Sequence, residues 1–226
     1  MRLFELLTEA PPVIKQSKGR APNKPKDIPM GGGAYASVLG HDDNPHEVMK
    51  ISHQAQHYMS RDGYEAFVKG LAENNMHDNP YLPRVRTLRT ITDDHGSVSY
   101  QARIERLTHL SELSEEQAET LVRKSLSPQF IKDDIKTQTA NTGGWLWFRV
   151  LRSWLSILDR FSKEIPSSIY STIKDSDLKG ALMFVNDLAQ EGNFMIDLQK
   201  SNFMARVSPY GTQLVITDPL GSQRYV

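Results

Sequence analysis

The sequence contains no cysteine among its 226 residues. This absence excludes disulfide bonds, thiol catalysis and cysteine-ligated zinc, and it leaves the redox compartment undetermined. Long apolar runs are also missing, since no stretch approaches the roughly 18 residues that a membrane-spanning helix needs. We therefore expect a soluble protein without a membrane partner.

An excess of charge of either sign is absent as well. Lys and Arg together number 27, Asp and Glu together also number 27, and the formal net charge is zero. A chain with no net positive charge gives no sign of a strongly basic face that would bind DNA or anionic lipid, so we expect no nucleic-acid partner. The hydrophobic fraction of 38% is that of a globular chain that can bury a core.

The composition divides the chain into an N-terminal peptide, a linker and a folded part. Residues 1–9 hold a short apolar stretch, and residues 10–26 are rich in Pro and Lys with little apolar periodicity, which predicts a flexible linker. In the folded part, strand patterns dominate residues 27–107 and helical patterns dominate residues 108–226. Strands followed by helices predict an α+β fold.

Apolar spacing places the main elements of the folded part. One helix is predicted between 58 and 71, and two strands at 84–92 and 97–107 are joined by a hairpin turn. Two further helices are predicted over 145–161 and about 177–191, the second ending at a glycine, before short strands return over 194–202 and 213–218.

Some local signals have structural interpretations. Ser114 and Gln117 have the spacing of a helix capping box. The tryptophans of the 145–161 helix, Trp145, Trp147 and Trp154, lie at helical spacing and are expected in the core rather than on a base-stacking surface.

A glycine run and a lysine form the first group of candidate phosphate-binding residues. Gly31, Gly32 and Gly33 have no Cβ, so their backbone can approach a phosphate oxygen closely, although three glycines also form a plain flexible turn. Lys50 follows on a short predicted strand, from which its ammonium can reach nucleotide phosphates. The alternative is a solvated strand lysine.

The most specific pattern lies near the C-terminus. Asp197 is followed after four other residues by Asn202, and Asp218 ends a later apolar stretch. Carboxylate and amide oxygens are ligands that Mg²⁺ accepts, and a carboxylate beside an acceptor hydroxyl can align it or take its proton. We predict that Asp197 serves the acceptor and that Asn202 and Asp218 bind metal. The alternative is that these residues only cap turns between buried strands.

Taken in order, five segments resemble protein kinases, and within them the early serine/threonine kinase family of T-odd bacteriophages: GGGAYASV, EVMKI, DGYEAF, DLQKSNFM and LVITDPL. The resemblance covers residues 28–221. It implies a two-lobed fold, with a small β-rich N-lobe over 27–107 and a reduced, mainly helical C-lobe over 108–226. It also implies ATP and Mg²⁺ as cofactors, host proteins as substrates in the host cytoplasm, and Asp197 and Lys50 as catalytic residues.

Further cofactor-binding residues follow from the same resemblance. Glu65, on the helix after Lys50, is expected to pair with that lysine and hold it in place, with Glu73 as the other available partner. Glu105 and the three glycines, Gly31 to Gly33, complete the expected nucleotide-binding set.

The sequence also departs from the family pattern. Met195 and Ile196 stand where the family has His-Arg, Pro219 follows the second aspartate, and the sequence ends eight residues after Asp218. We expect no full activation segment. Three interpretations stay open: a kinase for host protein hydroxyls, a catalytically weak kinase-like module that binds and inhibits a host factor, and a kinase-fold enzyme that phosphorylates a small molecule.

The N-terminal peptide carries a second resemblance. Leu7-Thr8-Glu9-Ala10 is similar to the site that the prohead protease of T-even-like phages cuts in the capsid-targeting sequences of internal head proteins. This implies cleavage between Glu9 and Ala10 by a phage prohead protease, residence in the capsid interior, and injection into the host. The alternative is an ordinary amphipathic first turn.

Overall fold

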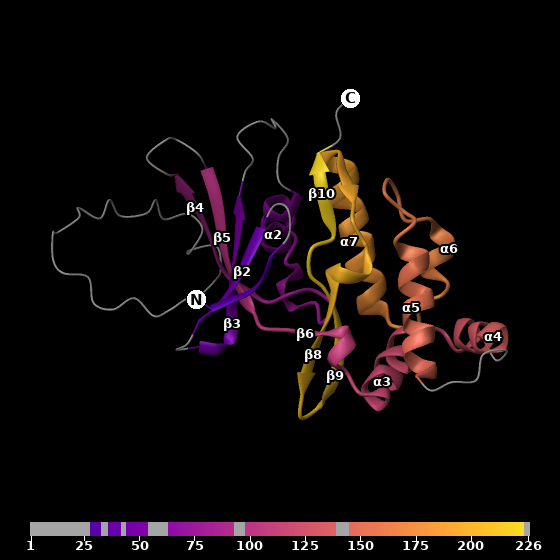
Figure 1. The fold of residues 1–226 in the computed structure, drawn as a ribbon. Coiled ribbons are helices and arrows are strands. Elements are labelled where there is room, and N and C mark those ends of the chain that lie inside the picture. Colours follow the sequence, from indigo (N-terminus) through magenta and orange to yellow (C-terminus); the bar gives the residue numbers. More distant parts are fainter. Residues whose placement is uncertain are drawn as a thin grey trace, which may run out of the picture. The chain divides into compact units, whose positions relative to one another are not determined.

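The computed structural model describes residues 28–32, 36–41, 44–53, 63–92, 98–138 and 145–223. The chain forms two compact units. The first comprises residues 1–58 and 84–106, and the second comprises residues 59–83 and 107–226. Both strands and helices are present, as the coloured elements of Figure 1 show, so the expected α+β class is confirmed.

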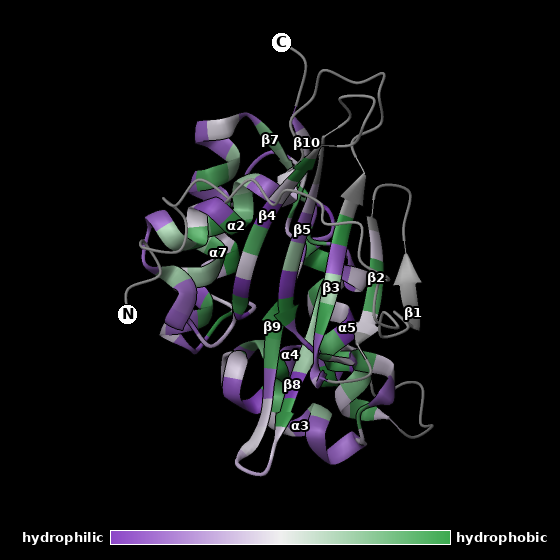
Figure 2. Ribbon diagram, turned by 90° about the vertical axis from the view of Figure 1, so that its left-hand side faces the viewer, coloured by the Kyte–Doolittle hydropathy of each residue, from purple (hydrophilic) through white to green (hydrophobic). Residues whose placement is uncertain are grey.

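The first unit is built on a five-stranded antiparallel sheet. Its strands are β1 (Ile28–Gly32), β2 (Ala36–His41), β3 (Asn44–His53), β4 (Val85–Thr92) and β5 (Val98–Glu105). They lie in the order β1-β2-β3-β5-β4, which places β3 between β2 and β5 (Figure 2). The two strands predicted at 84–92 and 97–107 are confirmed as β4 and β5, and the turn between them lies outside the described residues.

Strand β3 carries Val48 and Lys50 on one face of the sheet. Successive side chains of a strand alternate between its two faces, so Val48 and Lys50 share one face. Each of these residues is 8% exposed. On the neighbouring strand β5, Ala102 pairs with Lys50 and Ile104 pairs with Val48, and both partners are buried. The central strand therefore carries a lysine in a largely apolar setting.

The second unit contains the helices. They are α2 (Gly63–Glu73), α3 (Glu115–Ser125), α4 (Pro128–Gln138), α5 (Leu146–Leu158), α6 (Ser167–Tyr170) and α7 (Ser176–Gly192), with 3-10 turns η1 (Met76–Asp78), η2 (Leu110–Glu112) and η3 (Lys200–Asn202). No helix among the described residues is long and apolar enough to cross a membrane.

Two short sheets complete the second unit. β6 (Thr108–His109), β8 (Phe203–Ser208) and β9 (Gly211–Ile216) form one sheet, with β8 in the middle, while β7 (Phe194–Ile196) pairs with β10 (Leu220–Gln223). The strand predicted over 194–202 is therefore wrong in its second half. That half is a loop and the turn η3, which the backbone N–H of Asn202 closes by donating to Gln199 O.

Helix α2 belongs to the second unit although its residues lie within the range expected for an N-lobe. Its predicted apolar stripe is confirmed, since Tyr64, Phe67, Val68 and Leu71 are all buried. The helix packs on α7 and β10, and the Phe67 ring lies 6.2 Å from the ring of Phe184 on α7. Because this apolar stripe is buried against elements of the second unit, α2 belongs to that unit.

Helix α5 contributes a broad apolar face to the core. Trp154 is fully buried, and its Nε1 donates to Thr172 Oγ1 at 3.1 Å. Trp145, which was also expected in the core, is 61% exposed, and Trp147 is half-buried. The reason is positional: Trp145 is the N-cap of α5, with a left-handed φ of 71°, and so precedes the buried face of the helix.

The start of α3 and the end of α7 lie where the sequence predicts them. The capping box of α3 is confirmed: Gln117 N donates to Ser114 Oγ at 3.2 Å and Ser114 N donates to Gln117 Oε1 at 2.8 Å. Helix α7 ends at Gly192 as predicted, but the left-handed residue beyond it is Asn193, with a φ of 53°.

The contact between α2 and β10 requires a glycine. A Cβ at Gly63 would lie 2.2 Å from the backbone oxygen of Gly221 and 2.5 Å from that of Leu220. Backbone atoms cannot move aside as a flexible side chain can, so we expect Gly63→Ala to lower the free energy of unfolding by about 1–3 kcal/mol. Chemical unfolding followed by circular dichroism measures this loss.

Gly180 supplies the matched control. It lies on α7, and a Cβ there would meet only Asn79 Nδ2, at 3.9 Å. Gly180→Ala should keep or raise the stability because alanine favours a helix interior by about 1 kcal/mol over glycine. Equal stabilities of Gly63→Ala and the wild type would contradict the close backbone contact.

Candidate functional site

The segment from Asp197 to Asn202 is anchored on the core at both ends. Leu198 is 1% exposed and Phe203 is fully buried, and the Phe203 ring meets the ring of Trp154 edge-on at 6.4 Å. Asp197 and Asn202 are themselves half-buried. Buried apolar neighbours therefore fix the loop while its polar side chains stay accessible.

Hydrogen bonds within the loop hold its two polar ends together. Asn202 Nδ2 donates to the backbone oxygen of Asp197 at 2.8 Å, and the backbone N–H of Asn202 donates to Gln199 O at 2.9 Å. Gln199 Nε2 donates to Asp197 Oδ2 at 3.2 Å. Asp197 and Asn202 are thus spaced so that the Asn202 side chain closes a turn on the backbone of Asp197.

The segment around Asp218 is bonded to the same loop. Thr217 donates twice to the backbone oxygen of Asn202, from its N–H at 2.8 Å and from Oγ1 at 3.0 Å. On the other side of Asp218, Pro219 O accepts the N–H of Asp197 at 2.8 Å. The structure therefore brings together three of the predicted site residues, Asp197, Asn202 and Asp218, all within the second unit.

The donor atoms of this group suit Mg²⁺. The Nδ2 of Asn202 is engaged by Asp197 O, which leaves the amide oxygen as the atom that a cation can use. Mg²⁺ takes oxygen ligands from one or two carboxylates together with substrate phosphates and water. The described residues contain no group of three or more His, Cys, Asp or Glu placed to hold a metal. Two carboxylates and one amide are oxygen donors of the kind that such a site would use together with a phosphorylated ligand.

Lys50 lies in the first unit, in the middle of the sheet. It pairs with Val38 on β2 and with Ala102 on β5, and it is 8% exposed. Lysine is rarely buried without a reason, because removing its charge from water costs free energy. This degree of burial argues against a solvated strand lysine.

The other predicted nucleotide-binding residues have partners of their own. Glu65 lies on α2 in the second unit with only 13% of its side chain exposed, and it forms an ion pair with Lys69. Glu73 is exposed, so Glu65 is the better placed of the two glutamates for a buried ion pair. The pairing of Glu65 with Lys50 joins residues of different units and stays a prediction.

Glu105 and the glycines complete the set. Glu105 Oε1 accepts the backbone N–H of Arg84 at 2.8 Å, which ties the end of β5 to the start of β4. Gly31 and Gly32 lie on β1, and Gly33 lies outside the described residues, as do Glu9 and Ala10.

Sequence reasoning missed two residues that support the site. Thr217, directly before Asp218, makes both bonds to Asn202, and its only signal is its position beside the aspartate. Tyr81 supports β9 from the other side, since its backbone oxygen accepts the N–H of Ile216 at 2.8 Å. Its side chain is fully buried, with the hydroxyl 3.4 Å from Ser125 Oγ.

Tyr81 gives the unit a specific alkaline sensitivity. Burial raises the pKa of its phenol from 10.0 to about 12. A folded-state pKa above the unfolded value stabilises the fold fully below pH 10 and loses that contribution as the pH rises through 12. Two pKa units correspond to about 2.7 kcal/mol.

We therefore expect the unfolding free energy to fall over this alkaline range by less in Tyr81→Phe than in the wild type. Chemical unfolding at a series of pH values measures the difference. Tyr210→Phe is the control, since the Tyr210 side chain is fully exposed. An identical alkaline slope in Tyr81→Phe and the wild type would rule out this contribution.

Comparison with known proteins gives no family for the chain. No protein-family model matches the sequence, and no curated protein matches it. Any functional assignment must therefore be argued from the residues and the geometry described above.

Proposed function

We propose that the chain is an ATP- and Mg²⁺-dependent serine/threonine protein kinase, encoded by a bacteriophage and acting on host proteins in the host cytoplasm. In this proposal the sheet of the first unit is the core of a small N-lobe, and the second unit is a reduced, mainly helical C-lobe. The observation that carries the proposal is the closed Asp197–Asn202 loop bonded on both sides of Asp218.

The proposed roles follow from the chemistry of phosphoryl transfer. The acceptor hydroxyl oxygen bonds to the γ-phosphorus as the bond to the β–γ bridging oxygen breaks, and ADP leaves. Asp197 orients the hydroxyl and takes its proton, while Asn202 and Asp218 supply oxygen ligands for Mg²⁺. A bound Mg²⁺ would neutralise charge that develops on the phosphate oxygens. Catalysis would rest mainly on positioning and electrostatics.

The first unit supports the proposal through Lys50. In protein kinases the phosphate-binding lysine is carried by the third strand of the N-lobe. Lys50 is on β3, the central strand of the five-stranded sheet, and its burial fits a cation held by a ligand or an ion pair. In this proposal, the backbone of Gly31 and Gly32 on β1 covers the phosphates.

A kinase-like module that binds and inhibits a host factor is the second candidate. The observation in its favour lies directly before the proposed catalytic loop, where Met195 is 42% exposed and Ile196 is 4% exposed. Neither residue can supply the cation that His-Arg provides in the family. An enzyme with this loop would lack an arginine at this position to contact a phosphorylated activation segment.

Substitution of the site residues tests the proposal. We expect Asp197→Ala and Asp218→Ala to lower phosphate transfer from γ-labelled ATP into host lysate by on the order of 10²-fold to 10³-fold or more. Lys50→Ala should weaken transfer severely, because the phosphates lose a cation. Asp187→Ala, an exposed aspartate on α7, is the matched control and should transfer normally.

The outcomes separate the candidates. Full activity in all three site variants would contradict the roles assigned to Asp197, Asp218 and Lys50. ATP binding without any transfer in the wild type would favour the inhibitor module. Labelled small molecules with no labelled protein would favour the small-molecule phosphotransferase.

We also propose that the N-terminal peptide is a capsid-targeting sequence cut between Glu9 and Ala10 by a phage prohead protease. This rests on the Leu-Thr-Glu-Ala sequence, and both cleavage residues lie outside the described residues. Mass spectrometry of purified virions should find the protein with Ala10 as its first residue. An intact Met1 terminus inside mature particles would refute the processing.

A further inference from the structure

A hollow in the second unit combines cationic and apolar side chains. It has a volume of about 590 Å³ and lies among α3, α4, the first turn of α5 and the segment before α7. Four of its lining side chains are cationic, and none is acidic: Arg123, Lys132, Lys136 and Lys174. A volume of several hundred Å³ is typical of sites that enclose a small ligand or a few side chains.

The lysines and the aspartates of helix α4 lie on different faces of the helix. Its residues that line the hollow, Ile131, Lys132, Ile135 and Lys136, fall within an arc of about 140° at 100° per residue. The two aspartates of the helix lie outside that arc and have other partners: Asp133 accepts from Gln129 Nε2 at 2.7 Å, and Asp134 accepts from Ser153 Oγ on α5 at 2.6 Å. Neither aspartate lines the hollow.

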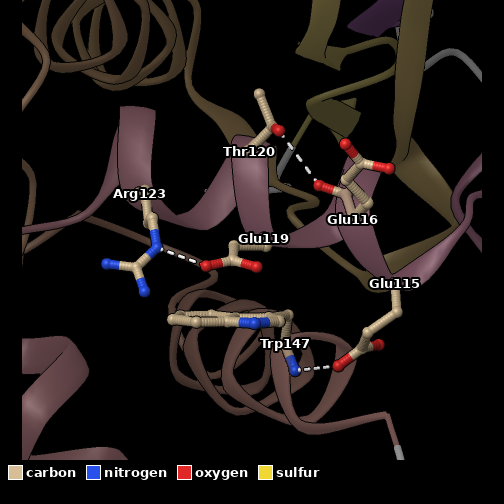
Figure 3. A network of polar contacts seen from close by, with 6 residues as sticks. All are labelled: Glu115, Glu116, Glu119, Thr120, Arg123 and Trp147. Carbon is tan, nitrogen blue, oxygen red and sulfur yellow. Dashed lines mark hydrogen bonds and ion pairs between the residues drawn. The ribbon is translucent and has the colours of Figure 1, made fainter.

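Helix α3 adds a positioned arginine. The Arg123 guanidinium lies over the ring of Trp147 at 4.5 Å from its centroid, while its Nε contacts Glu119 Oε1 at 2.6 Å. Figure 3 shows the two terminal nitrogens of Arg123 extending away from Glu119. Glu115 Oε1 accepts the backbone N–H of Trp147 at 2.6 Å, which ties the start of α5 to α3. Stacking and the ion pair thus hold the arginine in place before any ligand binds.

The fourth cation is fixed through its backbone. Lys174 N donates to Ser125 O at 2.9 Å, and the adjacent Ile173 pairs with Leu126 in a β-bridge. These contacts join the segment before α7 to the end of α3. Cations from three separate segments therefore converge on an apolar surface that includes Leu126, Ile131 and Ile135.

We propose that this hollow binds an acidic segment of the protein acceptor, with carboxylates on the four cations and an apolar side chain on the surface between them. This inference rests on the proposed kinase function and specifies its substrate class: proteins with an acidic and apolar docking segment. Charge complementarity of this kind accelerates encounter and suppresses wrong partners.

A peptide fits the hollow better than a nucleic acid does. Nucleic-acid surfaces need an extended basic stripe or exposed aromatic rings for base stacking. Here one face of Trp147 is covered by Arg123, and the apolar residues on α4 share their arc with the lysines. Alternating apolar and cationic groups match a chain that alternates apolar and acidic side chains.

The test measures binding to the whole chain in the absence of ATP and Mg²⁺. The probe is a short fluorescein-labelled peptide of alternating glutamate and leucine, followed by fluorescence anisotropy. Lys132→Gln combined with Lys136→Gln should weaken its binding about tenfold, because two charge pairs are lost. Arg152→Gln combined with Arg160→Gln removes the same charge from exposed positions that do not line the hollow, and it should bind as the wild type does.

Several results would overturn the proposal. These are equal binding of a peptide with glutamine in place of glutamate, equal loss in the two double variants, or displacement by inorganic phosphate or duplex DNA as readily as by unlabelled peptide. In the transfer reaction, the lysine double variant should raise KM for an acceptor that carries the acidic segment and leave kcat unchanged. Peptide binding without any phosphate transfer would refute the kinase function alone.

Discussion

The side chain of Asn202 makes the contact on which the candidate site depends. Its Nδ2 bonds to the backbone oxygen of Asp197, while its own backbone oxygen accepts two bonds from Thr217. One residue thereby joins the start of the loop, the end of the loop and the segment that carries Asp218. Together with the bond from the Asp197 N–H to Pro219 O and the pairing of β8 with β9, these bonds bring the segments that carry the two aspartates side by side.

The core supports this arrangement from behind. Leu198 and Phe203 are buried on either side of η3, and Trp154 of α5 packs edge-on against Phe203. Apolar burial therefore fixes the backbone, and the backbone in turn orients the polar groups. In the first unit, Lys50 lies on the strand between β2 and β5, and its side chain is also buried.

The sequence allowed local features of the fold to be predicted because their signals are local. Apolar spacing identified α2, and the Ser114–Gln117 pair identified the start of α3. The exposure of Trp145 and the grouping of α2 with the second unit could not be read in this way, because they depend on tertiary packing. The site shows the same division: the spacing of Asp197 and Asn202 is local, whereas the bonds from Thr217 link distant segments.

The central claim is that this loop forms part of a site for a nucleotide and its Mg²⁺. Isothermal titration of ATP into the whole chain, with Mg²⁺ and then with EDTA, tests it most directly. The account predicts binding that depends on Mg²⁺ and weakens at least about tenfold in Asp218→Asn, because a charged ligand to the cation is lost. No binding in Mg²⁺, or the same affinity in EDTA and in the variant, would contradict it.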